Sequence, residues 1–271
     1  MRRFASVTLH PAGDQAVLVE FAGEVSPELS SQIQSLANWF NRSVKEGVYE
    51  CIPGFKTLYV EYDPLVYTFS VLQGLIHQGL CDMPKTAEMT SKVIWIPVCY
   101  DPELAPDLSD VAEINGLTVE DVIRLHSQPQ YYVYFTGFLP NFPFLKGMPR
   151  EIATPRLARP RVLVPGGSVG IAGEQTGFYP VDSPGGWRIV GRIPVRMYDR
   201  RRDQPFLLQQ GDWLQFFPIS RSEYEDLQEL DRLSPYEFRI ESLHKGRFMG
   251  ENPVILTEGQ STVDDSREVE T

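Results

Sequence analysis

The segment from Tyr134 to Ile193 constrains the fold most, because glycine or proline recurs every few residues and no helix of ordinary length can form there. The pieces between these residues are short and rich in β-forming side chains, as in Arg161–Val164 and Ser168–Ala172. The segment also carries large apolar side chains that need burial, Trp187 among them, and little of the Ser, Gln and Glu typical of linkers. These features predict a compact, sharply turned β structure of the Greek-key or barrel-like type, with a few helices.

Strands and helices alternate over the first part of the chain. Ser26 followed by Pro27 is typical of a helix start, and Asp63-Pro64 is expected to open a second helix in the same way. The order β-α-β-β-α-β is that of a ferredoxin-like split motif and predicts a small α/β domain. The strands are expected at Gln15–Phe21, Val48–Ile52, Thr57–Tyr62 and Lys92–Val98.

A second domain is expected to begin near Met89. Thr118–Asp121 forms a capping box for one of its helices, and Tyr131–Phe135 leads into the segment rich in glycine and proline. The end of the chain has the composition of a disordered tail. The predicted fold class is therefore α+β, with a small ferredoxin-like α/β domain at 1–88, a β-barrel domain at 89–233 and a partly disordered C-terminal extension at 234–271.

The charge of the chain limits its partners. A net charge of −11 at pH 7 argues against nucleic-acid binding, which needs a positive surface. Between Gly137 and Arg196, however, arginines outnumber acidic residues, so this part is basic within an acidic protein. A basic region suits a carboxylate or phosphate ligand or an acidic partner; the alternative is that the arginines only solvate turns.

The sequence shows no sign of targeting or of a membrane span. Met1–Phe4 is not followed by an apolar stretch of signal-peptide length, and no apolar run approaches the length of a membrane span. Cys51, Cys81 and Cys99 have no metal-ligand spacing and lie in or beside apolar runs, which indicates reduced cysteines. We therefore expect a soluble, cytoplasmic protein without a metal site.

Several unusual peptides follow one another in the order seen in one protein family. Two lie near the start, Gly13–Leu18 and Pro53–Leu58, and the second is followed by Asp63-Pro64. The others are Gly137–Pro140, Phe142–Leu145, Ala153–Arg156, Val164–Val169, Gln175–Gly177 and Asp182–Trp187. On these peptides the chain resembles the PxpB family, the B subunits of 5-oxoprolinases, also described as KipI-like or allophanate hydrolase subunit 1. The resemblance spans roughly residues 4–230 and implies a cyclophilin-like β-barrel for the second domain.

The resemblance implies a non-autonomous subunit of an ATP-dependent 5-oxoprolinase, which hydrolyses 5-oxo-L-proline to L-glutamate. The implied partners are the C subunit (KipA-like, allophanate hydrolase subunit 2) and the A subunit (LamB/YcsF family). ATP is expected at the level of the complex, because this sequence has no Walker loop or other recognisable phosphate cradle. Two alternatives follow from relatives with other roles: an inhibitor of a sensor histidine kinase, as KipI is, and a subunit of an allophanate- or urea-degrading amidohydrolase.

One short motif could carry a nucleophile. Gly166–Gly170 fits G-x-S-x-G, the nucleophile elbow in which a strand leads into a sharp turn and then a helix. Here Gln175–Gly177 follows closely and cannot form that helix. The favoured interpretation of Ser168 is a turn serine ahead of a strand, and a catalytic Ser168 is the alternative.

Five residues are candidates for ligand contacts. Arg156 and Arg188 could bind a carboxylate or phosphate through two hydrogen bonds. Gln175 and Thr176 could present an amide and a hydroxyl to a lactam, or else form a polar turn that closes a hairpin. His126, at the end of a predicted helix, either interacts with the helix dipole or faces the ligand. No residue is predicted to be catalytic.

The peptide Phe138–Leu145 is an apolar strip with little polar relief. Its side chains either fill the barrel or face a partner chain. Asn141 stands within this strip where the family usually has glycine. If the backbone needs a positive φ there, asparagine is among the few residues that tolerate it.

Overall fold

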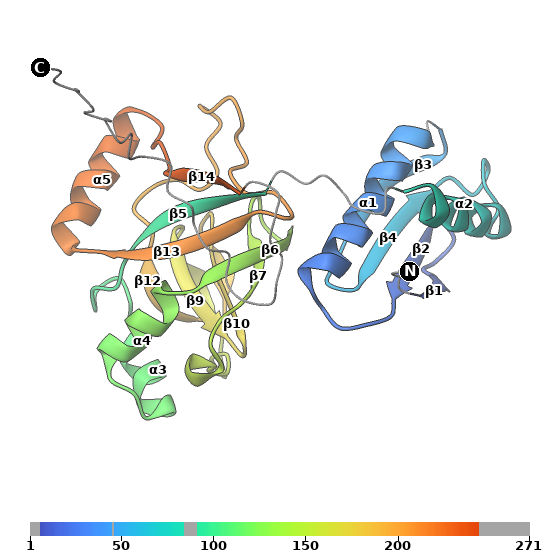
Figure 1. The fold of residues 1–271 in the computed structure, drawn as a ribbon. Helices are drawn as coiled ribbons and strands as arrows, with labels where there is room; N and C mark the ends of the chain where they lie inside the picture. The colour runs from blue at the N-terminus through green and yellow to red at the C-terminus, as the bar shows by residue number, and fades with distance from the viewer. Residues whose placement is uncertain (1–5, 45, 84–90, 244–271) are drawn as a thin grey trace, which may run out of the picture.

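The computed structural model describes residues 6–44, 46–83 and 91–243, which form two units with separate hydrophobic cores (Figure 1). The fold is mixed α+β, as the sequence predicts. The domain boundary expected at residues 88–89 lies outside the described residues. So do residues 244–271, for which the sequence predicts disorder.

An antiparallel four-stranded sheet and two helices form the first unit, with the strand order β1-β2-β4-β3. Alternate residues of β2 and β4 are buried, so one face of the sheet shares a core with α1 and α2. Helix α1 begins as predicted, because the Ser26 hydroxyl accepts a hydrogen bond from the Leu29 N–H at 3.2 Å and Pro27 follows it. The elements are β1 (Val7–Pro11), β2 (Ala16–Phe21), α1 (Pro27–Ser43), β3 (Val48–Pro53), β4 (Thr57–Tyr62) and α2 (Phe69–Asp82).

The ferredoxin-like arrangement of this unit is not confirmed. Its last strand, predicted at Lys92–Val98, is β5 (Ser91–Cys99) and lies in the sheet of the second unit. The position next to β2 is taken by β1, which the sequence analysis missed and which forms a hairpin with β2. Residues 93–99 of β5 are all buried except Trp95, a pattern typical of a strand with both faces covered.

The second helix starts later than predicted. The Asp63 carboxylate accepts a hydrogen bond from the Leu65 N–H at 2.9 Å, so Asp63-Pro64 closes a turn rather than opening a helix. Thr68 caps α2 instead, and its hydroxyl accepts from the Val71 N–H at 3.4 Å. Leu65, which the sequence places on the buried face of the helix, is 94% exposed as a result.

The second unit is a nearly closed barrel of eight strands, in the order β10-β9-β12-β5-β13-β6-β7 with β14 pairing β5 in addition. This barrel fits the cyclophilin-like architecture that the resemblance implies. Strands β8 and β11 form a separate two-stranded ribbon. The barrel strands are β5, β6 (Gln130–Thr136), β7 (Pro143–Lys146), β9 (Ser168–Ala172), β10 (Gln175–Phe178), β12 (Arg188–Arg192), β13 (Trp213–Ile219) and β14 (Ile240–Leu243); the ribbon strands are β8 (Arg161–Val164) and β11 (Ser183–Gly185).

The barrel is left open between β7 and β10, whose backbones nevertheless approach closely. A Cβ atom on Gly177 of β10 would lie 3.1 Å from the carbonyl oxygen of Pro143 in β7 and 3.3 Å from the Trp187 ring. A side chain at this position would therefore push the two strands apart. The absence of a Cβ at Gly177 lets the aromatic residues described below converge beside this opening.

Helices α3 (Leu108–Asn115) and α4 (Val119–Ser127) contribute to the barrel core. Helix α4 begins as predicted, with the Thr118 hydroxyl accepting from the Asp121 N–H at 3.1 Å. The chain then adds η1 (Arg150–Ile152), a short 3₁₀ turn, and α5 (Arg221–Leu233) after β13. Because β14 pairs with β5, the extension predicted from residue 234 onward begins as part of the barrel.

The two units contact each other through an aromatic side chain. Phe55, in the turn between β3 and β4, packs against rings of the barrel, with centroid distances of 4.9 Å to Phe135 and 6.3 Å to Phe144. The Lys146 ammonium lies 5.7 Å from the centroid of the Phe55 ring. The peptide Pro53–Leu58, noted in the sequence as part of the family resemblance, thus carries a contact between the units.

Within the described residues, no helix is long and apolar enough to cross a membrane.

Asn141 has the positive φ that the sequence analysis considered, 65°. Its buried side chain also joins two loops: the amide nitrogen donates to the Met197 carbonyl at 3.1 Å, and the amide oxygen accepts from the Leu208 N–H at 3.3 Å. Asparagine therefore combines tolerance of the left-handed region with two hydrogen bonds that glycine could not make.

We expect Asn141→Ala to lower the free energy of unfolding by about 2–4 kcal/mol, because it strains the backbone, leaves the Leu208 N–H without this hydrogen bond and removes one of the two donors to the Met197 carbonyl. Asn141→Gly should cost about 1 kcal/mol less, since glycine adopts the same φ without strain. Urea denaturation of both variants checks this. Equal losses for Ala and Gly would show that the backbone angle does not matter at this position.

Candidate functional site

A pocket of about 240 Å³ opens on the barrel beside the gap between β7 and β10. All of its lining residues except Tyr179 come from peptides that the sequence analysis singled out, although these residues lie up to 49 positions apart. The pocket is lined by Phe138, Phe142, Phe144, Arg156, Tyr179, Pro184, Gly185, Gly186 and Trp187. Only Arg156 among these carries a charge, so the pocket is largely aromatic.

Phe142 is the centre of the aromatic wall. Its ring lies 5.5 Å from the ring of Trp187 at an interplanar angle of 81°, and 5.7 Å from the ring of Tyr179 at 77°. Phe142, Tyr179 and Trp187 are buried and form a small core of their own. Edge-to-face contacts of this kind hold aromatic rings in defined orientations, so the wall is preorganised.

Phe138 stands at the mouth of this pocket in an unusual conformation. Its φ is 68°, and its side chain is 77% exposed. A non-glycine residue in the left-handed region costs free energy, and such residues concentrate at binding sites and switch regions. An exposed phenylalanine held in this way is a sign that the mouth of the pocket makes a contact.

Arg156 supplies the positive charge of the pocket. Its guanidinium lies 6.0 Å from the centroid of the Trp187 ring, close enough for a cation–π interaction. The described part of the chain gives Arg156 no carboxylate partner. Burial raises the pKa of Tyr179, while the Trp187 backbone and the charges of Arg156 and Arg161 act in the opposite direction. Because no described carboxylate pairs with it, the Arg156 guanidinium is free to bind an anionic group of a ligand.

A buried ion pair fixes the wall next to the pocket. The Arg161 guanidinium donates to both oxygens of Asp107, at 2.7 and 2.8 Å, and Asp107 is only 4% exposed. The same carboxylate accepts a hydrogen bond from the Ile189 N–H at 2.6 Å. Arg161 belongs to β8, so this pair anchors the ribbon β8–β11, from which Pro184 and Gly185 reach the pocket.

The pocket can bind but lacks the groups for a complete reaction. Its aromatic walls suit a small, flat body, and Arg156 suits a carboxylate or phosphate on that body. Neither a carboxylate nor a histidine lines it to act as a general acid or base. Across residues 6–44, 46–83 and 91–243, the structure brings together no set of His, Cys, Asp or Glu side chains that could hold a metal ion.

The structure places the five predicted ligand contacts in different surroundings. Arg156 lines the aromatic pocket, whereas Arg188 donates to the Pro155 carbonyl at 3.1 Å and to the Asp110 carboxylate at 2.9 Å. Gln175 lies at the start of β10, in the β9–β10 hairpin. The binding roles of all five residues stay predictions.

His126 and Thr176 come together, but inside the barrel. His126 is fully buried and stacks on Phe216 with a centroid distance of 4.8 Å. Its Nδ1 lies 2.8 Å from the Tyr100 hydroxyl and its Nε2 lies 2.8 Å from the Thr176 hydroxyl. The Thr176 hydroxyl donates to the Gly170 carbonyl at 3.0 Å, so Nε2 carries the proton and Nδ1 accepts from Tyr100.

This burial also decides the charge of His126. It lowers the pKa of the imidazole to about 3, so the ring is neutral at physiological pH. A neutral ring cannot provide the charge–dipole interaction that the sequence analysis considered for a histidine at a helix end. His126 instead forms part of a buried hydrogen-bond network.

The nucleophile-elbow interpretation of Ser168 is wrong. Ser168 is the first residue of β9, which continues into a hairpin with β10, and no helix follows. The side chain is fully buried and its hydroxyl makes no hydrogen bond. Without a base or solvent access, this hydroxyl cannot act as a nucleophile.

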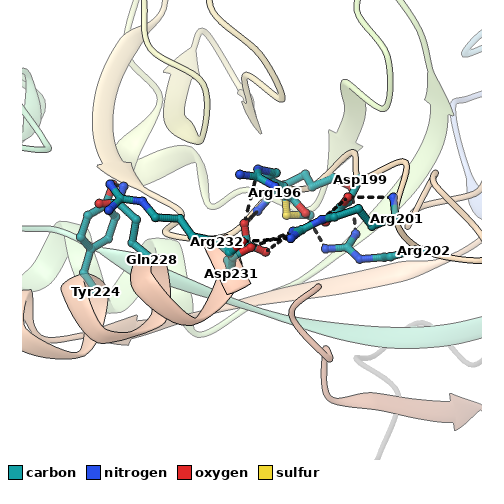
Figure 2. Close-up of polar contacts among 9 residues, drawn as sticks. Arg196, Asp199, Arg201, Arg202, Tyr224, Gln228, Asp231 and Arg232 are labelled. Carbon is teal, nitrogen blue, oxygen red and sulfur yellow. Dashed lines mark hydrogen bonds and ion pairs between the residues drawn. The ribbon is translucent and has the colours of Figure 1, made fainter. Parts of the chain in front are cut away.

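A larger groove of about 440 Å³ lies between the barrel and α5. Figure 2 shows polar contacts at and beside this groove, where Asp231 at the end of α5 faces Arg196 and Arg201. Arg201 donates to Asp199 at 2.6 Å and to the Asp231 carbonyl at 2.7 Å, so it also satisfies the C-terminal end of α5. Because Asp199 and Asp231 are paired with these arginines, we interpret the groove as the attachment of α5 rather than as the primary binding site.

Two residues of the pocket region were missed by the sequence analysis. Tyr179 follows the β10 strand without a recognisable motif, and Asp107 immediately precedes α3. An aspartate before a helix is typical of an N-cap, yet Asp107 makes no side-chain cap bond and pairs with Arg161 instead. The spacing of residues along the chain carries no signal for this pairing.

The buried histidine predicts how stability changes with pH. The unfolded chain binds a proton at His126 near pH 6.5, while the folded chain binds it only near pH 3, so the unfolded state holds more protons between these values. The free energy of unfolding should therefore fall as pH drops below about 6.5, by up to about 1.4 kcal/mol per unit from this residue. Denaturation at pH 7, 6 and 5, compared with His126→Gln as the non-titrating control, checks this. Identical pH slopes would contradict a neutral, buried His126.

Comparison with known proteins agrees with the resemblance found in the sequence. The model of the family "Carboxyltransferase domain, subdomain C and D" matches residues 7–208. The 5-oxoprolinase B subunit of Bacillus subtilis is 37% identical over 227 residues, covering 80% of this chain and 95% of that protein. The 5-oxoprolinase B subunit of Escherichia coli O157:H7 is 39% identical over 208 residues, covering 76% and 93%.

Solved structures share the fold. The crystal structure of TTHA0988 superimposes with a TM-score of 0.66 at 37% identity, covering 76% of this chain but only 40% of that one. The Kluyveromyces lactis urea carboxylase gives a TM-score of 0.75 at 20% identity, covering 88% of this chain and 24% of that one, a likeness of fold alone. The family match over most of the chain, together with relatives above 35% identity along nearly their whole length, shows that this chain belongs to the family of 5-oxoprolinase B subunits among the carboxyltransferase-domain proteins.

Proposed function

We propose that the chain is the B subunit of a cytoplasmic, ATP-dependent 5-oxoprolinase, which hydrolyses 5-oxo-L-proline to L-glutamate together with the A subunit (LamB/YcsF family) and the C subunit (KipA-like). The names of the relatives support this activity. The composition of the aromatic pocket supports a subunit that depends on partners for catalysis. The pocket offers a binding surface with the unpaired guanidinium of Arg156, but no acid–base pair lines it.

The pocket fits the chemistry of 5-oxoproline. This substrate has a small ring with one carboxylate, which the aromatic wall and Arg156 can hold at the same time. The wall also excludes water from the lactam, which protects an activated form from unproductive hydrolysis. Groups outside the pocket then activate the lactam carbonyl with ATP. The ATP site is therefore a property of the assembled complex.

Arg156 is the residue on which this proposal depends most. Arg188 already has a carboxylate and a carbonyl partner, and His126 and Thr176 would reach a ligand only if the barrel opened. Gln175 lies in the hairpin outside the pocket lining. We therefore propose that Arg156 binds the substrate carboxylate and that the other four residues act, if at all, through the positions of the surrounding strands.

The decisive experiment combines this chain with the purified LamB/YcsF-family and KipA-like partners, ATP and 5-oxoproline, and measures glutamate. We expect turnover with all three proteins, and none when any protein or ATP is omitted. Robust turnover by this chain alone would sink the proposal. Parallel reactions with urea and with allophanate as substrates test the activity suggested by more distant relatives named urea amidolyase.

We expect Arg156→Ala to lower kcat/KM for 5-oxoproline in the assembled complex by about 10- to 100-fold, the loss expected for a charged hydrogen bond to a carboxylate. Arg156→Lys should recover part of it, because the charge remains but the two-pronged geometry is lost. Arg150→Ala is the matched control, since Arg150 is 85% exposed and pairs with Glu174 outside the pocket. An equal loss of kcat/KM in Arg150→Ala and Arg156→Ala would contradict a specific role of Arg156 in substrate binding.

A further inference from the structure

At the mouth of the aromatic pocket and on the adjacent ribbon β8–β11, apolar side chains are left uncovered by the described part of the chain. Val162 is 90% exposed, Leu163 is 58% exposed and Phe138 is 77% exposed. Single exposed apolar residues are common, but several in one place mark an interaction surface. We call Phe138, Val162, Leu163, Pro184 and Arg159 the rim surface.

Pairing within the ribbon brings the rim residues close together. Ser183 of β11 pairs with Val164 of β8, and Gly185 pairs with Arg161, so the backbone of Pro184 lies opposite Val162 and Leu163. Pro184 in turn lines the pocket together with Phe138. The exposed residues of β8 therefore lie one strand away from the pocket mouth.

The ribbon that carries the rim surface is anchored by other residues, so the exposed apolar side chains of the rim are not needed to hold it in place. The ribbon is anchored by the Arg161–Asp107 pair, and Val164 alone of the apolar residues on β8 is buried. In the described part of the chain β8 pairs only with β11, so its other edge is free. Rigid, exposed apolar residues on a free strand edge favour aggregation unless a partner covers them.

The charges at the rim define the chemistry of that partner. Arg159 is exposed, next to Pro160, which lies against Gly186 of the pocket. As with Arg156, the described residues provide no carboxylate for Arg159, although the whole chain has a net charge of −11. A partner with apolar side chains flanked by carboxylates would therefore complement both the rim and the pocket mouth.

We propose that the rim surface is where the KipA-like partner docks, placing an apolar and acidic segment of that protein over the mouth of the aromatic pocket. This inference rests on the proposed function, in which groups from another chain must reach the pocket. Chains such as TTHA0988, of which this chain covers only 40%, contain the same unit joined to further sequence. In the proposed complex, a binding surface takes the place of that covalent link.

The test uses calorimetry to measure the affinity of the purified KipA-like partner for this full-length chain. Val162→Asp places a charge in the apolar rim and should weaken binding at least about 10-fold. Leu65→Asp is the matched control, because Leu65 is 94% exposed in the first unit, and its affinity should stay within about twofold of the unmodified chain. Equal thermal midpoints for the two variants show that the fold is intact, since neither side chain is buried.

A charge reversal gives an independent readout. Arg159→Glu should weaken binding and reduce its dependence on salt, because a screened attraction to carboxylates is lost. If the unmodified chain binds the KipA-like partner and the Val162→Asp and Arg159→Glu variants bind equally well, the docking site is wrong while the proposed function stands. If the unmodified chain does not bind this partner at all, both proposals fall.

Discussion

The ion pair between Asp107 and Arg161 is the constraint on which the candidate site depends. A carboxylate that is 4% exposed must have its charge compensated, and here two guanidinium hydrogen bonds and the Ile189 N–H do so. The partners come from the start of α3, from the ribbon β8–β11 and from β12. Removing Arg161 would leave the buried Asp107 carboxylate without its charge partner, and the ribbon would lose this anchor beside the pocket.

Under the proposed function, substrate binding and chemistry are carried by different chains. The walls of the pocket are well ordered by aromatic contacts, and the single free guanidinium of Arg156 gives the pocket its polarity. The groups that could do acid–base work lie elsewhere, either buried, as His126 is, or paired with an arginine, as Asp107 is. A site with this composition suits a small anion, and under the proposed function another chain supplies the groups that transform it.

The sequence predicts local features well and pairings across the chain poorly. The barrel-like character of the region rich in glycine and proline and the caps at Ser26 and Thr118 follow from short-range rules. The strand at Lys92–Val98 was predicted, but its sheet was not, because its run of buried residues fits any interior strand.

The candidate site shows the same division. Arg156, Arg161 and Arg188 look alike in the sequence, yet the start of α3 supplies a carboxylate to Arg161 and Arg188 and leaves Arg156 free. His126 and Thr176 meet across 50 residues of chain, so no local pattern distinguishes a buried network from a ligand site. At Phe55, contact between the units has a mechanical result: this ring touches Phe144, which lines the pocket, so a rotation of one unit against the other must either shift that wall or break an aromatic contact.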